Sequence, residues 1–252
     1  MKTAICIVSV APLRAEASHR SEMVSQLLFG ETCRIIEEKP GWKKVQCNYD
    51  NYEGWCQGSQ TIPFDQQGMD EPDLLTASWL NEITLNGRPM YVPMGCPVQF
   101  LHHGVFRWDK NHLSYRGETY QVKTPAYNWL LERVMQYRNT PYLWGGRSVF
   151  GIDCSGYAQA VYRYFGIPLP RDAYQQAEKG QVVEFLQSAR IGDLAFFENE
   201  EGKIVHVGIL LNEHEIIHAS GTVRIDKIDT EGIVHSDSGE RTHKLRIIKR
   251  YF

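Results

Sequence analysis

The stretch DCSGYAQAVYRYFG, residues 153–166, places a cysteine at the start of a predicted helix. Its apolar residues recur at spacings of three and four, as on one face of an α-helix, and Gly166 then acts as a stop signal. Asp153 is a preferred N-cap residue, so Cys154 falls in the first turn. Unpaired backbone N–H groups at that turn favour a thiolate and predict a lowered pKa for Cys154. A small, buried and unreactive cysteine is the alternative.

Two histidines follow in short apolar runs that are typical of strands. His206 lies in VHVGIL, residues 205–210, and His218 lies in EIIHA, residues 215–219. With a third run at residues 193–197 they predict an antiparallel meander. A thiol nucleophile needs a base, and that base needs an acceptor on its second ring nitrogen to fix its tautomer. His206 is therefore the candidate base and His218 the orienting residue, although a neighbouring carbonyl would also satisfy a histidine at position 206.

Six ordered motifs resemble the NlpC family of bacterial cell-wall cysteine peptidases, which share a papain-like core. The resemblance implies that Cys154 is the nucleophile, His206 the general base and His218 the orienting residue. It also implies that the hydroxyl of Tyr142 helps to hold the oxyanion, with a core tyrosine as the alternative. The motifs are TPYLWGG (140–146), DCSG (153–156), LPR (169–171), GDLAFF (192–197), HVGI (206–209) and IHA (217–219).

The N-terminal half is rich in short runs with strand character, separated by Gly and Pro, which predicts small β-barrels. The elements at 12–14, 28–31, 41–45 and 52–55 resemble a bacterial SH3-like domain, and a weaker stretch at 88–118 is interpreted as a second one. A helix-like segment at 126–136 then opens the catalytic domain. We expect an α+β protein with SH3-like barrels at residues 1–60 and 61–123, a linker within 63–73, and a papain-like domain at 124–252. The first four runs are residues 5–10, 32–37, 42–46 and 53–56.

Composition and charge narrow the classes of partner. The net charge of −3 and the scattered cations give no basic footprint for nucleic acid. The chain contains no run of eighteen apolar residues, so we expect no membrane span. We also expect a monomer without metal or cofactor. Cys154, His206 and His218 would in principle supply three zinc ligands, but a thiolate held by zinc would lose its role as a nucleophile.

The compartment is predicted from the N-terminus and the cysteines. Residues 1–10 superficially resemble a signal peptide with a cleavage site at 15–17, yet residues 8–14 also supply a predicted strand, so we interpret the segment as structural. The cysteines at 6, 33, 47, 56, 96 and 154 show no paired zinc spacing and fit reduced thiols in the cytoplasm. A periplasmic or secreted protein is the alternative if a signal peptide has been removed.

The resemblance also narrows the substrate. Members of this family cleave the bond from the γ-carboxyl of D-glutamate to a diamino acid in murein stem peptides. A branch with two SH3-like domains acts on free peptides that begin with L-Ala and requires their terminal amine. Asp172 matches that branch because a carboxylate pairs with an ammonium group, with a helix-capping Asp as the alternative. The first barrel is then expected to offer Tyr52 and either Glu22 or Glu16.

Three further residues complete the predicted substrate-binding set, namely Trp144, Asp153 and Ser155, with Ser155 holding the peptide backbone. The resemblance therefore predicts an endopeptidase for free murein peptides such as L-Ala-γ-D-Glu-diaminopimelate, acting in cell-wall recycling. A murein hydrolase that cuts intact peptidoglycan, a papain-like acyltransferase and a wall-binding protein without activity are the alternatives. The last of these would have no reason to carry both Cys154 and His206.

Overall fold

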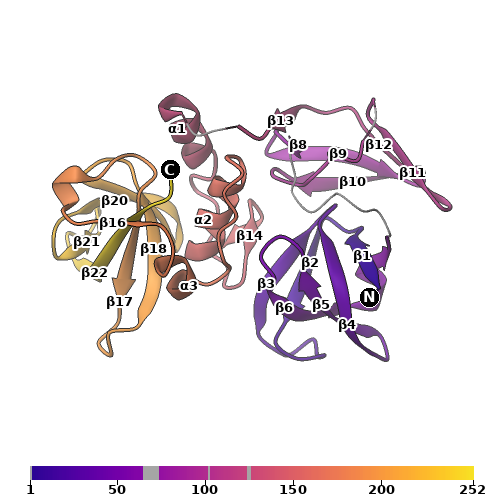
Figure 1. The fold of residues 1–252 in the computed structure, drawn as a ribbon, viewed down its shortest axis with the longest axis horizontal. Coiled ribbons are helices and arrows are strands. Elements are labelled where there is room, and N and C mark those ends of the chain that lie inside the picture. The colour runs from indigo at the N-terminus through magenta and orange to yellow at the C-terminus, as the bar shows by residue number, and fades with distance from the viewer. Residues whose placement is uncertain (1, 65–73, 102, 124–125) are drawn as a thin grey trace. The chain divides into compact units, whose positions relative to one another are not determined.

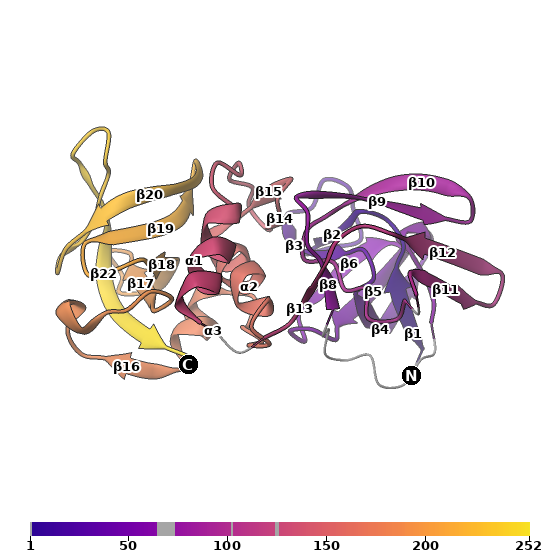
Figure 2. The same cartoon turned by 90° about the horizontal axis from the view of Figure 1, so that it is seen from above.

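The computed structural model describes residues 2–64, 74–101, 103–123 and 126–252 (Figures 1 and 2). Contacts between residues divide the chain into two compact units. Unit 1 is Met1–Lys123 with Trp144–Val149, and unit 2 is Thr124–Leu143 with Phe150–Phe252. Most of the predicted linker, residues 65–73, lies outside the described residues.

The first sheet of unit 1 is antiparallel and has the strand order β3-β2-β6-β5-β4-β1-β7. The strands predicted at 32–37, 42–46 and 53–56 are present as β4, β5 and β6. The run predicted at 5–10 is divided between the end of β1 and the start of β2, and β2 covers residues 10–14 of the strand predicted at 8–14. Gly41 forms the turn between β4 and β5 at a φ of +79°, a left-handed conformation that favours glycine. The elements are β1 Thr3–Cys6, β2 Val10–Arg14, β3 Met23–Leu28, β4 Thr32–Lys39, β5 Trp42–Cys47, β6 Glu53–Gln57, the short helix η1 Gly58–Gln60 and β7 Thr61–Pro63.

The second part of unit 1 is a four-stranded antiparallel sheet in the order β10-β9-β12-β11, with β13 paired to β8. Asn86 and Gly87, both at positive φ, connect β9 to β10 as a two-residue hairpin turn. One cluster of buried side chains joins Ile5 and Leu28 of the first sheet to Ile83 and Val92 of the second. Packing thus groups both sheets in one unit, and the boundary after residue 60 stays a prediction. The strands are β8 Leu74–Thr76, β9 Leu80–Leu85, β10 Arg88–Pro93, β11 Val105–Trp108, β12 Asn111–Tyr115 and β13 Thr119–Gln121.

The segment Trp144–Val149, which contains β14 (Arg147–Ser148), packs within unit 1. The guanidinium of Arg147 donates to Glu31 at 3.1 Å and to the backbone oxygen of Gln26 at 2.7 Å. The side chains of Arg147 and Glu31 are each only 3% exposed. Both charges are therefore removed from water, and each depends on the other for compensation.

Replacing Arg147 by alanine is expected to lower the free energy of unfolding by about 3–5 kcal/mol, because it leaves the Glu31 carboxylate buried without its partner. Urea denaturation monitored by tryptophan fluorescence measures this change. Lys2→Ala is the matched control, since it breaks the exposed ion pair with Glu38 and should leave stability nearly unchanged. Equal effects of the two substitutions would contradict a structural role for the buried pair.

Unit 2 combines three α-helices with a β-sheet that closes on itself. Its sheet runs in the order β16-β22-β17-β18-β19-β20-β21, and β21 pairs back to β22, so six strands form a ring. The predicted meander is present as β17, β18 and β19, and the predicted helices are α1 and α2. Among the described residues no helix is both long and apolar enough to cross a bilayer. The elements are α1 Tyr127–Gln136, β15 Gly151–Ile152, α2 Cys154–Arg163, α3 Ala173–Ala177, β16 Gln181–Val183, η2 Leu186–Ser188, β17 Leu194–Glu198, β18 Ile204–Leu210, β19 Glu215–Ser220, β20 Thr222–Ile228, β21 Gly232–Val234 and β22 Arg241–Arg250.

Buried aliphatic and aromatic side chains fill the interior of this ring, among them Phe197, Ile216 and Ile233. Helix α2 packs on β18 and β19. These contacts bring Cys154, at the start of α2, to the strands that carry the two predicted histidines.

Candidate active site

Cys154 is the first residue of α2, and Asp153 is its N-cap with the side chain accepting from the N–H of Gly156 at 2.7 Å. Cys154 is only 7% exposed. Burial raises the pKa of this thiol to about 12, the Asp153 carboxylate adds to the rise, and hydrogen bonding with the backbone of Val207 opposes it. The predicted lowering of the thiol pKa is therefore wrong, because the start of the helix is buried and not open to water.

His206 and His218 lie on the neighbouring strands β18 and β19 and form a direct hydrogen bond. Nε2 of His206 is 2.8 Å from Nδ1 of His218, and the two rings are nearly perpendicular at 84°. Both are buried, at 6% and 1% exposure. Burial holds the pKa of His206 well below its usual range, and positive charge on His218 or His243 would lower it further. Burial therefore disfavours both the thiolate of Cys154 and the imidazolium of His206.

The row of hydrogen bonds continues to Asp226 on β20, a residue that sequence reasoning missed. Its Oδ2 lies 3.0 Å from Nε2 of His218, and both side chains are 1% exposed. Burial alone would raise the pKa of Asp226, but hydrogen bonds from His218, the Ser236 N–H and Arg224 hold it well below its usual range. The only sequence signal was an Asp at a buried position within the apolar alternation of TVRIDKI, residues 222–228.

His243 on β22 is a second residue that the sequence did not single out. Its ring stacks on that of His206 with centroids 4.1 Å apart and planes 27° apart. Ligand atoms of His206, His218 and His243 lie within 4.8 Å of one another, as in a metal site. Nε2 of His206 and Nδ1 of His218 are hydrogen-bonded to each other, however, and the ring of His243 stacks on that of His206. We therefore interpret the three histidines as a stacked and hydrogen-bonded cluster.

A separate cavity of about 480 Å³ in unit 2 is lined by Leu130, Arg190 and neighbours, and not by these histidines.

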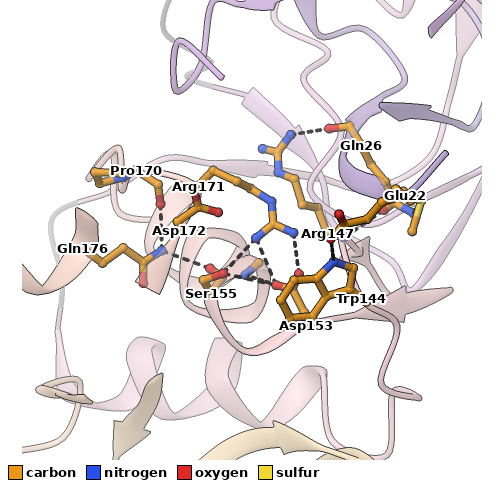
Figure 3. A network of polar contacts seen from close by, with 12 residues as sticks. Glu22, Gln26, Trp144, Arg147, Asp153, Ser155, Pro170, Arg171, Asp172 and Gln176 are labelled. Atoms are coloured by element: carbon orange, nitrogen blue, oxygen red, sulfur yellow. Dashed lines mark hydrogen bonds and ion pairs between the residues drawn. The ribbon is translucent and has the colours of Figure 1, made fainter. Parts of the chain in front are cut away.

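Arg171 organises the polar groups at the start of α2 (Figure 3). Its guanidinium forms an ion pair with Asp153 and donates to Oγ of Ser155 at 2.8 Å. The amide of Gln176 in α3 donates to the backbone oxygens of Ser155 and Pro170 at 3.1 and 2.8 Å. Arg171 is 2% exposed, so its charge is compensated inside the protein. The predicted binding residues Asp153 and Ser155 are thus held in fixed positions by this network.

Two further predicted residues of unit 2 lie close to the same helix start. Tyr142 is 36% exposed, which excludes the alternative of a core tyrosine. Burial, then the nearby groups of Cys154 and Asp153, raise the pKa of its phenol to about 12, so the hydroxyl stays protonated and can donate. Asp172 is the N-cap of α3 and forms a capping box with Gln175. This is the helix-capping role that the sequence offered as the alternative to a substrate contact.

The predicted residues of unit 1 are brought together only in part. Nε1 of Trp144 donates to Oε1 of Glu22 at 2.6 Å, and Trp144 is 58% exposed (Figure 3). Tyr52 precedes β6, where its backbone N–H donates to Asp50 at 3.0 Å. Glu16 lies in the exposed turn after β2, where its N–H donates to Ser21. Of the two glutamates proposed from the sequence, Glu22 is the one that contacts another predicted site residue.

Comparison with known proteins places these features in a family. The profile of the NlpC/P60 family matches residues 139–241, and that of the bacterial dipeptidyl-peptidase Sh3 domain matches residues 13–60. A gamma-D-glutamyl-L-lysine dipeptidyl-peptidase of Bacillus cereus is 28% identical over 90% of this chain and 77% of its own length. A "probable endopeptidase" of Haemophilus influenzae is 36% identical over 46% of this chain and 71% of its own.

The fold is also found in a solved structure. The crystal structure of an NlpC/P60 family protein from Bacillus cereus has a TM-score of 0.80 to this chain at 22% identity, and the match covers 99% of each chain. The expected papain-like domain with an SH3-like domain is thereby confirmed. The chain belongs to the NlpC/P60 family and is a cysteine peptidase.

Proposed function

We propose that the chain cleaves the bond between the γ-carboxyl of D-glutamate and a diamino acid in free murein peptides that begin with L-Ala. The carrying observation is the placement of Cys154 at a helix start that packs on β18, with the hydrogen-bonded His206 and His218 behind it. The relative from Bacillus cereus, named for a γ-D-glutamyl-L-lysine activity, supports the bond type. Peptide recycling is then the physiological role.

The finer organisation belongs to the same proposal. Residues 61–123 form a second SH3-like domain, and the chain acts as a monomer in the cytoplasm. Buried free thiols support that compartment, since oxidising compartments favour disulfides. These thiols are Cys6, Cys33, Cys47, Cys56 and Cys154.

In the proposed mechanism, acylation begins with Cys154 as a neutral thiol and His206 as a neutral imidazole. Because burial disfavours both the thiolate and the imidazolium, the proton moves from the thiol of Cys154 to Nδ1 of His206 as sulfur attacks the γ-glutamyl carbonyl. The hydroxyl of Tyr142 and the backbone N–H groups at the start of α2 are the proposed donors to the oxyanion. His206 then gives its proton to the departing amine, the C–N bond breaks, and a thioester to Cys154 forms.

Deacylation reverses the roles of the same groups. A water molecule attacks the thioester carbonyl and gives its proton to Nδ1 of His206. The C–S bond breaks, and the thiol of Cys154 is restored as it takes the proton back. Throughout both halves His218 accepts from Nε2 of His206 and keeps the ring in place. None of these steps requires a metal ion.

The terminal amine of the substrate is assigned to Asp172. Its carboxylate lies two residues after Pro170, beside the network of Arg171, and a carboxylate can cap a helix and accept from an ammonium group at the same time. Ser155 and Asp153 hold the peptide backbone in this proposal. In unit 1, Glu22, Tyr52 and Trp144 remain predicted substrate contacts, with Glu22 favoured over Glu16 by its bond to Trp144.

Acetylation of the substrate amine is expected to lower kcat/KM for L-Ala-γ-D-Glu-diaminopimelate by at least about 30-fold. The acetyl group removes the positive charge, and loss of a buried charge-assisted contact costs about 2 kcal/mol or more. Mass spectrometry of the released L-Ala-D-Glu measures the rate for free and acetylated peptide.

Asp172→Asn is the matched variant for this test, because Asn also caps helices but carries no charge. It should slow cleavage of the free peptide and bring the kcat/KM values for the free and the acetylated peptide closer together. Equal cleavage of both substrates by the wild type would end the recycling proposal and leave the peptidase assignment in place.

Two further assays distinguish the alternative functions. Release of fragments from intact sacculi would indicate a murein hydrolase, and transfer of an acyl group to an added amine would indicate an acyltransferase.

A further inference from the structure

A buried carboxylate ends the row of hydrogen bonds behind the candidate nucleophile. The row runs from Nε2 of His206 to Nδ1 of His218 at 2.8 Å, and from Nε2 of His218 to Oδ2 of Asp226 at 3.0 Å. Each of the three side chains is at most 6% exposed, so water does not compete for these bonds. Which atom donates and which accepts in these two hydrogen bonds therefore depends on the protonation of His206, His218 and Asp226.

An ionised carboxylate only accepts hydrogen bonds, so Nε2 of His218 must carry a proton. With His218 neutral, its Nδ1 is then a lone pair and accepts from Nε2–H of His206. A neutral imidazole carries one ring proton, which leaves Nδ1 of His206 as a lone pair. The opposite order would put a proton on Nδ1 of His206, and that nitrogen would be unable to receive one from a thiol.

We propose that Asp226 is a positioning residue that fixes the order of protons along His218 and His206, so that Nδ1 of His206 is free to act as the base. This inference rests on the proposed role of His206. Asp226 contacts neither the thiol nor His206 directly and acts through His218.

The groups around Asp226 keep its carboxylate ionised, so that it accepts hydrogen bonds. Its Oδ1 accepts from the backbone N–H of Ser236 at 2.8 Å and from Nη2 of Arg224 at 2.9 Å. Arg224 is held in turn by Asp237 at 2.9 Å. His218, the Ser236 N–H and Arg224, whose Nε also lies 2.9 Å from Oδ2, all bring donors to the carboxylate. These donors favour its charged form and keep its pKa well below the usual range.

Asp226→Asn tests the proposal because it keeps the shape of the side chain and changes the donor pattern. Ser236 and Nη2 of Arg224 still donate at the Oδ1 position, so the amide oxygen is expected there. The NH2 group then takes the Oδ2 position, facing Nε2 of His218 and close to Nε of Arg224. Nε2 of His218 then accepts, Nδ1–H donates to His206, and Nδ1 of His206 becomes protonated. We expect kcat/KM to fall by about 100-fold or more, as when an amide replaces an orienting carboxylate and stabilises the wrong tautomer of the base.

Three measurements separate this role from a merely structural one. Nitrogen NMR of the imidazoles should show the wild type protonated at Nε2 of both His206 and His218, and the variant protonated at Nδ1 of both. In a His218→Ala background Asp226→Asn should cause no further loss of rate, because the path through position 218 is already broken. Asp237→Asn, which removes a carboxylate one ion pair further out, should leave the rate unchanged.

Protonation of wild-type His206 at Nδ1 would overturn the inference, as would an undiminished effect of Asp226→Asn in the His218→Ala background. A variant rate within about threefold of the wild type would do the same. Should Asp226→Asn fail to fold, the NMR of the wild type alone decides. Since that measurement needs no substrate, the inference and the proposed function can fail separately.

Discussion

Replacing Cys154 by alanine is expected to lower kcat for the free murein peptide by at least about 10⁴-fold. The thioester forms on the sulfur atom, so without it the two-step route is closed and only the contribution of binding and oxyanion donors remains. Cys154→Ser should be nearly as inactive, because a hydroxyl is a far weaker nucleophile beside an imidazole whose pKa is already held low. Release of L-Ala-D-Glu, followed by mass spectrometry, measures the loss.

The fold should survive this change. Alanine removes one buried sulfur atom at the start of α2, while the cap from Asp153 to Gly156 and the ion pair with Arg171 remain. Thermal unfolding and substrate binding to Cys154→Ala should therefore resemble the wild type. Cys56→Ala, which empties a similar volume in the core of unit 1, is the control and should retain turnover. Retained hydrolysis by Cys154→Ala would remove the assignment of the nucleophile.

The sequence was sufficient for those parts of the fold that have local signals. The periodicity of residues 157–165 with Asp153 before it and Gly166 after it specified α2, because caps and apolar spacing act over one or two turns. The meander that carries His206 and His218 followed from alternating apolar residues and turns in the same way. The two histidines do meet at hydrogen-bonding distance, as their order along neighbouring strands suggested.

The features that the sequence did not reveal depend on tertiary register. Asp226 reaches His218 because β20 pairs with β19 so that Ile216 opposes Asp226 and His218 opposes Arg224. His243 stacks on His206 only because β22 closes the ring of strands. A shift of either register by one residue would turn these side chains to the other face of the sheet. The thiol pKa was mispredicted for a related reason, since the degree of burial of a helix start is not a local property.

The insertion of Arg147 into unit 1 is another long-range feature. The sequence placed the motif TPYLWGG wholly within the catalytic domain, at residues 124–252. In the structure, Tyr142 stays in unit 2 while residues 144–149 pack in unit 1. Gly145 makes this possible, since at a φ of +77° a Cβ atom there would lie 2.5 Å from the backbone oxygen of Met23. One continuous motif thus serves two packing units.

Replacing His206 by alanine is expected to cost about as much as losing the nucleophile, at least about 10⁴-fold in kcat. Because burial raises the pKa of the Cys154 thiol to about 12, the attacking sulfur needs a base that takes its proton, and His206 is the proposed base. The double variant Cys154→Ala/His206→Ala should be no slower than either single variant, since the two act as one unit. The rate of peptide cleavage at pH 7 is to be measured for the two single variants and the double variant.

His218→Ala should lose less than His206→Ala, on the order of 10²-fold, because it leaves the base in place and removes only what orients it. His243→Phe is the matched control, since it keeps an aromatic ring stacked on His206, removes only the ring nitrogens and should stay within a few-fold of the wild type. A loss in His218→Ala that exceeded the loss in His206→Ala would reverse the proposed roles. Near-normal turnover by His206→Ala would instead require a different base.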